Sequence, residues 1–255
     1  MSLSKNKIKY VQSLKDKKFR EEHNTFVVEG DKMVAELLPA MKCQLLIATP
    51  DFIQTNFIRP DNIEEIIEVS KSELSRASFL KNPQQALAVF YQPHYALDSH
   101  QLKDQLSLAL DCIQDPGNMG TIIRLADWYG IENIICSLDT VDVYNPKVVQ
   151  ATMGALARVK VHYMDLYSYL KNIEEIPLYG TFLDGRNMYE QELAQTGIIV
   201  MGNEGNGISP QIETLITNKL FIPNYPQDRE TSESLNVAIA TAIICTEFRR
   251  RLQKQ

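Results

Sequence analysis

The sequence predicts an α/β protein in two parts, a small N-terminal α/β domain over residues 1–92 and a larger domain over residues 106–255 built on a parallel sheet. Apolar runs of strand length alternate with segments of helix length along most of the chain. The polar, proline-bearing stretch at 92–105 indicates a linker, placed at 93–105. A chain of 255 residues with 44% hydrophobic and 23% charged residues is long and apolar enough for one medium and one small domain.

The N-terminal elements follow from short apolar runs and their flanking residues. A strand is expected at 25–28, and the helix after it, at 31–38, ends at Pro39. Ser70 is the expected N-cap of a helix over "KSELSRAS". Three further strands are expected in the segments "CQLLIATP", "EEIIEVS" and "QQALAVFYQP".

The second part continues the alternation of strand and helix. Strands are predicted at 106–112, 132–137, 157–163, 177–183, 197–202 and 219–222. Helices are predicted at 119–129, 145–155, 165–173, 209–217 and 234–252. Because these strands are apolar throughout, we expect a parallel sheet that is covered on both faces.

Composition narrows the class of protein. No apolar run reaches the roughly 20 residues of a membrane helix, and the N-terminus lacks an apolar signal segment. The four cysteines are scattered, without a C-x-x-C pair, and each lies in an apolar run. Buried, reduced thiols in a cytoplasmic protein are therefore expected, with no membrane and no metal site.

The net charge of −6 is unevenly distributed. Residues 1–20 hold seven basic residues against one acid, and the last seven residues hold four basic residues. Two basic ends on an acidic body could contact nucleic-acid phosphates, or they could be solvated terminal helices.

The first chemically informative stretch is "DPGNMGTIIRLADWYG", residues 115–130. We expect a turn over 115–118 and a cap on the following helix from Asn118. Helical side chains lean toward the N-terminus, so Arg124 would lie over Gly120, which has no side chain, and reach the mouth of the loop. Taken alone, Arg124 could also be an ordinary surface arginine.

The second stretch, "GIIVMGNEGNGISPQIETLI" at 197–216, runs from an apolar strand into a glycine-rich loop. Ser209 is the expected cap of the next helix, with Pro210 in its first position. The stretch is neither a P-loop nor a G-x-G-x-x-G motif. Glu204 would repel a pyrophosphate and would suit a ligand that carries positive charge, although the glycines could serve the turn alone.

The third stretch begins with a strand that ends at Pro223 and continues through a polar loop to Ser234. The helix that follows is apolar almost all round, which indicates burial, in part against a second chain. Asn236 in its first turn needs a hydrogen-bond partner, either backbone or ligand.

Together the three stretches resemble the ordered motifs of the SpoU/TrmH family of RNA ribose 2′-O-methyltransferases, in the SPOUT superfamily. The matching residues are Asn118, Gly120 and Arg124, then Gly202 to Ser209, then Ile222, Pro223 and Ser234 to Ala238. The N-terminal segment also resembles the family's small substrate-binding domain, which has a ribosomal-protein-like α/β fold.

The resemblance implies a deep trefoil knot, S-adenosylmethionine bound in that knot, and a homodimer formed through the knotted domain and the C-terminal helix. It also assigns the site residues. Cofactor-binding positions are Gly202, Ile222 and Leu235, and catalytic or supporting positions are Asn118, Arg124, Glu204 and Asn236. The loop at 224–233 departs from the family, because it is longer than usual and has no glycine.

Family proposals make the motif-one arginine the general base, but a guanidinium stays protonated in proteins. We therefore expect Arg124 to hold a phosphate and stabilise the developing alkoxide. Ribosomal RNA is favoured as substrate over transfer RNA, because a separate N-terminal domain is typical of the ribosomal enzymes. Two other readings stay open at this point, a nucleotide-binding oxidoreductase and a homologue that binds RNA without catalysis.

Overall fold

The computed structural model describes residues 3–56, 60–226 and 234–252 and divides the chain into two compact units. Unit 1 holds residues 1–94 together with 142–158, and unit 2 holds 95–141 and 159–255. The segment 142–158 lies within the stretch assigned to the larger domain from the sequence, yet it packs with the N-terminal residues. The described part of the chain has no helix that is both long and apolar enough to cross a bilayer.

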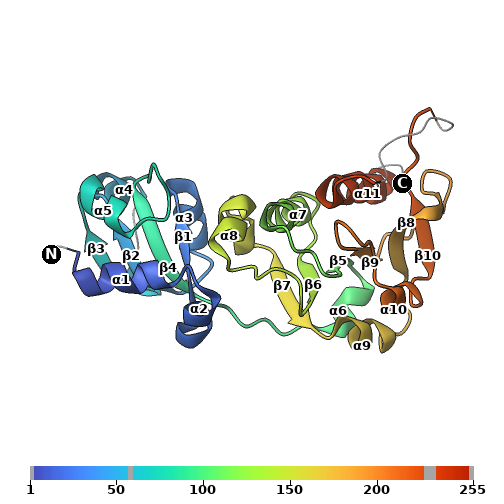
Figure 1. Cartoon of the computed structure of the whole chain (residues 1–255), viewed down its shortest axis with the longest axis horizontal. Helices are drawn as coiled ribbons and strands as arrows, with labels where there is room; N and C mark the ends of the chain where they lie inside the picture. Colours follow the sequence, from blue (N-terminus) through green and yellow to red (C-terminus); the bar gives the residue numbers. More distant parts are fainter. Residues whose placement is uncertain (1–2, 57–59, 227–233, 253–255) are drawn as a thin grey trace. The chain divides into compact units, whose positions relative to one another are not determined.

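Unit 1 is built on a four-stranded sheet with the order β1-β4-β2-β3 (Figure 1). Its strands are β1 (Thr25–Glu29), β2 (Cys43–Ala48), β3 (Ile63–Glu68) and β4 (Ala86–Tyr91). Its helices are α1 (Lys5–Ser13), α2 (Lys17–His23), α3 (Asp31–Leu37), α4 (Pro50–Thr55), α5 (Lys71–Ala77) and α8 (Pro146–Thr152), with 3₁₀ turns at Pro60–Asn62 and Ala155–Ala157. The predicted capping of α5 is confirmed, since Ser70 and Glu73 form a reciprocal capping box.

Two layers of helix enclose the unit 1 sheet. Val11 of α1, Leu14 directly after it and Leu74 of α5 pack on the face that carries Val27 and Val89. The residues between these on the strands point to the opposite face, where Phe26 packs against the ring of Tyr144 at a centroid distance of 4.6 Å. The segment 142–158 is therefore part of the core of unit 1.

A buried ion pair also fastens this segment. Arg20, only 2% exposed, donates from Nη2 to Asp142 Oδ2 at 2.7 Å and from Nη1 to the backbone carbonyls of Leu14 and Lys15. Gly154 adopts a φ of +95°, which favours glycine, and a Cβ there would displace the Glu36 carboxylate. Pattern and periodicity predicted the helix near 146, but they carry no information on which unit it packs against.

Unit 2 confirms the predicted parallel sheet. Six strands lie in the order β10-β8-β9-β5-β6-β7, and every pairing between neighbours is parallel (Figure 1). The strands are β5 (Leu106–Leu110), β6 (Asn133–Ser137), β7 (Lys160–Met164), β8 (Leu178–Asn187), β9 (Gly197–Met201) and β10 (Asn218–Phe221). The helices are α6 (Ser99–Lys103), α7 (Pro116–Trp128), α9 (Leu166–Lys171), α10 (Pro210–Glu213) and α11 (Val237–Leu252).

Three predicted details of unit 2 differ from the structure. The expected linker contains α6, whose Leu102 is fully buried. Helix α7 begins at Pro116, and its cap is Asp115, whose Oδ1 accepts from Asn118 N at 2.7 Å, so the predicted capping role of Asn118 is wrong. Proline in the first helical turn has no hydrogen bond to lose, which allows the earlier start.

The segment that leads to the C-terminal helix also differs from the prediction. Helix α11 begins at Val237, three residues later than predicted. The trefoil knot stays a prediction, because residues 227–233, which lead to this helix, lie outside the described residues. The same holds for most of the unusual loop at 224–233.

Candidate active site

The sheet order of unit 2 brings two of the three motif loops together. Strands β5 and β9 are parallel neighbours, with Leu110 opposite Met201, so the loops after them leave the same edge of the sheet. The Asp111 amide continues the ladder by donating to the Met201 carbonyl at 2.9 Å. Chain order reverses between these two strands, and such a switch point is where open parallel sheets bind their ligands.

The loop after β9 is a tight turn that requires its first glycine. Asn203 and Gly207 form an isolated two-residue bridge, and the Asn203 side chain accepts from the amides of Gly205 and Asn206. A Cβ on Gly202 would lie 2.2 Å from the Gly207 carbonyl carbon and from the Ile208 nitrogen. Only glycine permits the backbone to close on itself at this position.

A buried carboxylate holds the far end of this turn. Asp111, 5% exposed, accepts from the Ser209 amide at 2.6 Å. Ser209 occupies the predicted N-cap position of α10, but its hydroxyl makes no cap hydrogen bond and has no partner among the described residues. The backbone amide of Ser209, rather than its side chain, therefore anchors the loop.

Glu204 connects the second motif loop to the first. Its Oε1 accepts from Asn118 Nδ2 at 3.1 Å and from the Asp115 amide at 3.2 Å, while Oε2 lies 3.4 Å from the Gln114 amide. The start of α7 directs these donors at one carboxylate. Glu204 therefore fixes the first motif loop against the second, a role that the sequence left undefined.

Asn236 adds the third motif to the same network. Its Oδ1 accepts from the amides of Ala238 and Ile239 and so caps α11, while its Nδ2 donates to Asn118 Oδ1 at 2.9 Å. The chain Asn236–Asn118–Glu204 thus satisfies the amide of Asn118 on both sides. The partner that the sequence required for Asn236 is both backbone and side chain.

A cavity of about 490 Å³ lies beside this network, within the range of roughly 300–1,000 Å³ for small-molecule sites. Gly202, Ile222 and Leu235, the three predicted cofactor positions, all line it, together with Glu204. The strand β8, the loop after β9 and helix α11 supply the other walls, with Thr181, Phe182, Leu183, Phe221, Val237 and Ala240 among the lining residues.

Sequence reasoning missed the wall contributed by β8. Phe182 lies under the Lys219 ammonium, whose Nζ is 4.6 Å from the ring centroid, and Lys219 in turn pairs with Glu213 and Asp184. The position of Phe182 near the end of a predicted parallel strand was the available signal, because neighbouring strands end at the same edge as the motif loops.

Arg124 lies on the exposed side of α7, six residues after Asn118. Among the described residues it makes no hydrogen bond or ion pair, and it lies outside the Asn236–Asn118–Glu204 network. A guanidinium with five free donors is suited to bind a phosphate arriving from solvent.

The thiols are unsuited to nucleophilic roles. Burial raises the pKa of Cys43 and of Cys245 to about 12, and it raises the pKa of Cys136 as well. Cys112, which follows β5, also has a raised pKa, through desolvation first and then through nearby Asp139. All four cysteines are free thiols, and the predicted burial is confirmed for Cys43, Cys136 and Cys245 but is wrong for Cys112, which is half-buried.

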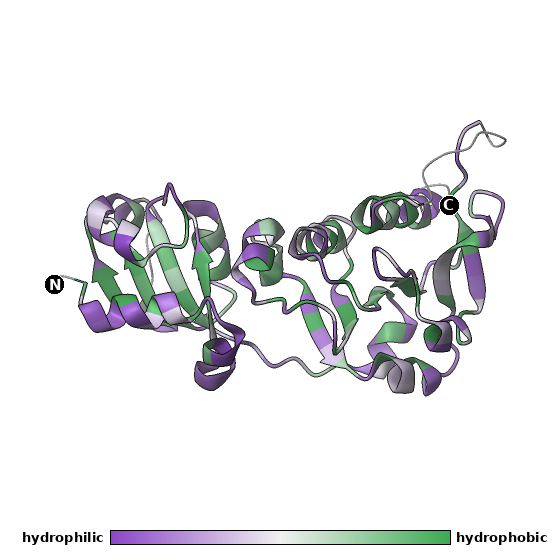
Figure 2. Cartoon of the chain, in the orientation of Figure 1, coloured by the Kyte–Doolittle hydropathy of each residue, from purple (hydrophilic) through white to green (hydrophobic). Residues whose placement is uncertain are grey.

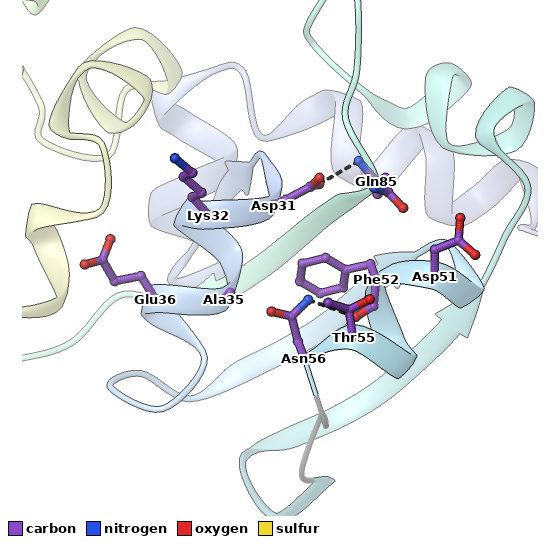
Figure 3. Close-up of a pocket in the computed structure, with 9 residues that line it drawn as sticks. All are labelled: Asp31, Lys32, Ala35, Glu36, Asp51, Phe52, Thr55, Asn56 and Gln85. Carbon is purple, nitrogen blue, oxygen red and sulfur yellow. Dashed lines mark hydrogen bonds between the residues drawn. The ribbon is translucent and has the colours of Figure 1, made fainter.

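A separate hollow of about 570 Å³ lies in unit 1 between α3 and α4 (Figure 3). Three carboxylates, Asp31, Glu36 and Asp51, line it, and Asp31 already accepts from the Gln85 amide at 2.7 Å. Its acidic lining is unsuited to nucleic-acid phosphates, and none of the predicted site residues lies there.

Comparison with known proteins agrees with this geometry. The model of the SpoU rRNA Methylase family matches residues 105–246, and that of the MRM3-like substrate binding domain matches residues 5–88. The Bacillus subtilis 23S rRNA (guanosine(2553)-2′-O)-methyltransferase RlmP is 32% identical to the chain, over 97% of this chain and 98% of that protein.

Two solved structures extend the likeness over the whole chain. A TrmH-family protein from Porphyromonas gingivalis superposes with a TM-score of 0.87 at 42% identity, covering 98% of this chain and 100% of its own. The AdoMet-bound rRNA methyltransferase from Sinorhizobium meliloti gives a TM-score of 0.84 at 28% identity, covering 99% and 97%. With both parts matched and the three motifs assembled at one sheet edge, the chain belongs to the SpoU rRNA methylase family.

Proposed function

We infer that this chain is an S-adenosylmethionine-dependent methyltransferase that acts on a ribose 2′-hydroxyl of RNA. The observation that carries the inference is the hydrogen-bonded chain from Asn236 through Asn118 to Glu204, beside the cavity lined by the three expected cofactor positions. Two relatives, RlmP of Bacillus subtilis and RlmB of Neisseria meningitidis, are named as 23S rRNA guanosine-2′-O-methyltransferases. An oxidoreductase is disfavoured, since no acidic residue ends β10, which closes with Phe221 before Ile222, Pro223 and Asn224.

The cavity fits S-adenosylmethionine in size and lining. Ile222 and Leu235 offer apolar surface, and the turn at Gly202 brings backbone groups to the cavity wall. When bound, this cofactor supplies an electrophilic methyl group activated by a positively charged sulfur. Glu204 lines the same cavity and has no ion-pair partner among the described residues, so its carboxylate gives the cavity a negative potential that suits a cation.

Arg124 is the residue proposed to act on the RNA. In-line transfer requires the ribose hydroxyl to be held in line with the methyl group and to lose a proton. A protonated guanidinium can hold the neighbouring phosphate through two parallel hydrogen bonds and stabilise negative charge on the hydroxyl oxygen. The proton then leaves to solvent water.

Asn118, Glu204 and Asn236 are proposed as positioning residues. Both ends of the Asn118 amide are engaged within the protein, so it holds the start of α7 in place. This orients the helix from which Arg124 projects.

We propose ribosomal RNA as the substrate, supported by the end-to-end match with RlmP and by the separate N-terminal domain. A transfer RNA substrate and a catalytically inactive RNA-binding homologue are the alternatives. Mapping of 2′-O-methyl groups in a deletion strain, starting at the position equivalent to guanosine 2553 of 23S rRNA, separates these three possibilities. A mark lost only from transfer RNA, or no lost mark, contradicts the proposal.

A homodimer is also proposed, through the surface of α7 and α11. Trp128 of α7 is 84% exposed and Ile239 of α11 is 54% exposed, and the two helices pack side by side, with the hydroxyls of Tyr129 and Thr246 2.5 Å apart. Covering such side chains with a second copy would remove apolar surface from water. The four free thiols, three of them buried, support a cytoplasmic location.

The role of Arg124 is tested by Arg124→Lys, which keeps the charge but loses the two-donor geometry. We expect kcat for methyl transfer to fall about 10²–10³-fold while the Kd for S-adenosylmethionine is unchanged. Methyl incorporation and isothermal titration calorimetry measure the two quantities, and exposed Arg186→Lys is the control. Near-normal turnover of Arg124→Lys would contradict the bidentate role.

A further inference from the structure

Some basic residues at the N-terminus form ion pairs within the protein, and others do not. Of the seven within residues 1–20, Arg20 is buried against Asp142. Lys7 pairs with Glu65, and Lys17 lies 3.6 Å from Glu21. These three positive charges are partly or wholly neutralised by acidic side chains of the same chain.

The other four, Lys5, Lys9, Lys15 and Lys18, are exposed and have no ion-pair partner among the described residues. We call these four residues the α1 lysine face. Lys5 and Lys9 are one helical turn apart on α1, while Lys15 and Lys18 lie in the turn to α2 and at its start. Figure 2 shows the hydrophilic colouring of α1 and α2.

Two of these lysines make cation–π contacts with aromatic rings. Lys15 Nζ lies 4.8 Å from the centroid of Phe79, and Lys18 Nζ lies 5.9 Å from that of Phe19. Both rings are half-buried and pack on the core of unit 1. The charges are therefore held at the surface by fixed elements and point to solvent.

The basic residues near the C-terminus do not offer an equivalent surface. Arg249 donates to the carbonyls of Tyr129 and Gly130 after α7. Arg250 and Arg251 both bind Glu247, which is 3% exposed. Among the described residues, the N-terminal end is therefore the one that presents unpaired positive charge, while Lys254, the fourth basic residue of the C-terminal end, lies outside them.

Elsewhere unit 1 is acidic. The hollow in Figure 3, between α3 and α4, is lined by Asp31, Asp51 and Glu36, the last paired with Arg158, and by one base, Lys32. On the outer strand β3, Glu64 and Glu65 pair with Lys42 and Lys7, while Glu68 has no ion pair among the described residues. A polyanion approaching unit 1 is therefore attracted to the layer of α1 and repelled from the layer of α3 and α4.

We propose that the α1 lysine face binds the phosphate backbone of the substrate RNA, which rests on the proposed function in taking RNA as the substrate. Lysine ammonium groups contact phosphates as point charges and release the counterions condensed on the RNA. Such contacts give affinity and orientation without reading the base sequence. The face would anchor the RNA at a surface distinct from the cofactor cavity, which lies in unit 2.

The test replaces all four lysines with glutamine and measures binding to an unmodified in vitro transcript of 23S rRNA at several salt concentrations. The control replaces Lys32, Lys71, Lys147 and Lys171, which are exposed on other helices and likewise have no ion pair among the described residues, and so removes the same charge. We expect the first variant to bind about 10–100-fold more weakly and its salt slope to fall by about 3–4, while the control changes little.

Thermal unfolding and calorimetric titration with S-adenosylmethionine separate this inference from the proposed function. Both variants are expected to keep the melting temperature and the cofactor Kd of the wild-type protein. Equal binding of RNA by the first variant and the wild type overturns the inference, as does equal weakening in both variants. Failure of the wild type to bind the cofactor would instead count against the proposed function and leaves the RNA comparison readable.

Discussion

Gly202 shows how one missing side chain shapes the cofactor cavity. Its Cα lies where the turn after β9 folds back on itself, and the backbone of Gly207 and Ile208 occupies the space of a Cβ. Gly205, three residues on, is different, because a Cβ there would meet only Asn203 Oδ1 at 3.6 Å. The loop therefore requires glycine at position 202 but has room for a side chain at position 205.

Replacement of these glycines by alanine should separate those demands. We expect Gly202→Ala to push the turn into the cavity at a cost of about 1–3 kcal/mol, weakening S-adenosylmethionine binding about tenfold or more. Gly205→Ala is the matched control and should bind within about twofold of wild type. Calorimetric titration and thermal melting measure both, and an unchanged Kd for Gly202→Ala would show that the turn does not shape the site.

At the scale of elements, the starts of α7 and α11 decide how the three motifs meet. The sequence predicted both helices but began α7 at 119 and α11 at 234, whereas they begin at Pro116 and Val237. Several residues near each start can cap a helix, and local pattern does not choose among them. Hydrogen bonds in the folded protein determine which residue caps each helix. Asp115 caps α7, so that Asn118 donates to Glu204, and Asn236 caps α11 while it donates to Asn118.

Asn236 serves α11 and the motif network with different atoms, so two variants can separate the two functions. Asn236→Ala should lose both, lowering stability by about 1 kcal/mol and reducing turnover. Asn236→Asp keeps an acceptor for the helix amides but cannot donate to Asn118, so the melting temperature should hold while kcat falls about 2–10-fold. If Asn236→Asp turns over RNA at the wild-type rate, the bond to Asn118 is not needed for catalysis.

For the whole molecule, the residues of unit 1 are discontinuous in sequence. Strand and helix positions could be predicted from hydrophobic period, and the parallel sheet from uninterrupted apolar strands. The docking of 142–158 on the N-terminal sheet could not, because an amphipathic pattern does not identify its partner. The site was only partly predictable. The motif residues could be found from the sequence, but Phe182 belongs to no motif, and it lines the cavity because of where β8 lies in the sheet.

Asp142→Ala tests how strongly the docked segment depends on its ion pair. The substitution leaves the Arg20 guanidinium buried without its carboxylate, which we expect to lower the free energy of unfolding by about 3 kcal/mol or more. Asp139→Ala, an exposed acid three residues earlier, should change it by less than about 0.5 kcal/mol. Denaturant titration gives both values, and equal small effects would mean that the hydrophobic contacts alone hold the segment.

The membership of 142–158 in unit 1 bears on protein engineering. The backbone crosses between the units at 94–95, at 141–142 and at 158–159. A chimera that grafts a different recognition module onto this enzyme would have to exchange two separate pieces of sequence, the leading 94 residues and the internal 17. Swapping the leading piece alone would pair a foreign sheet with a helix shaped for the original one.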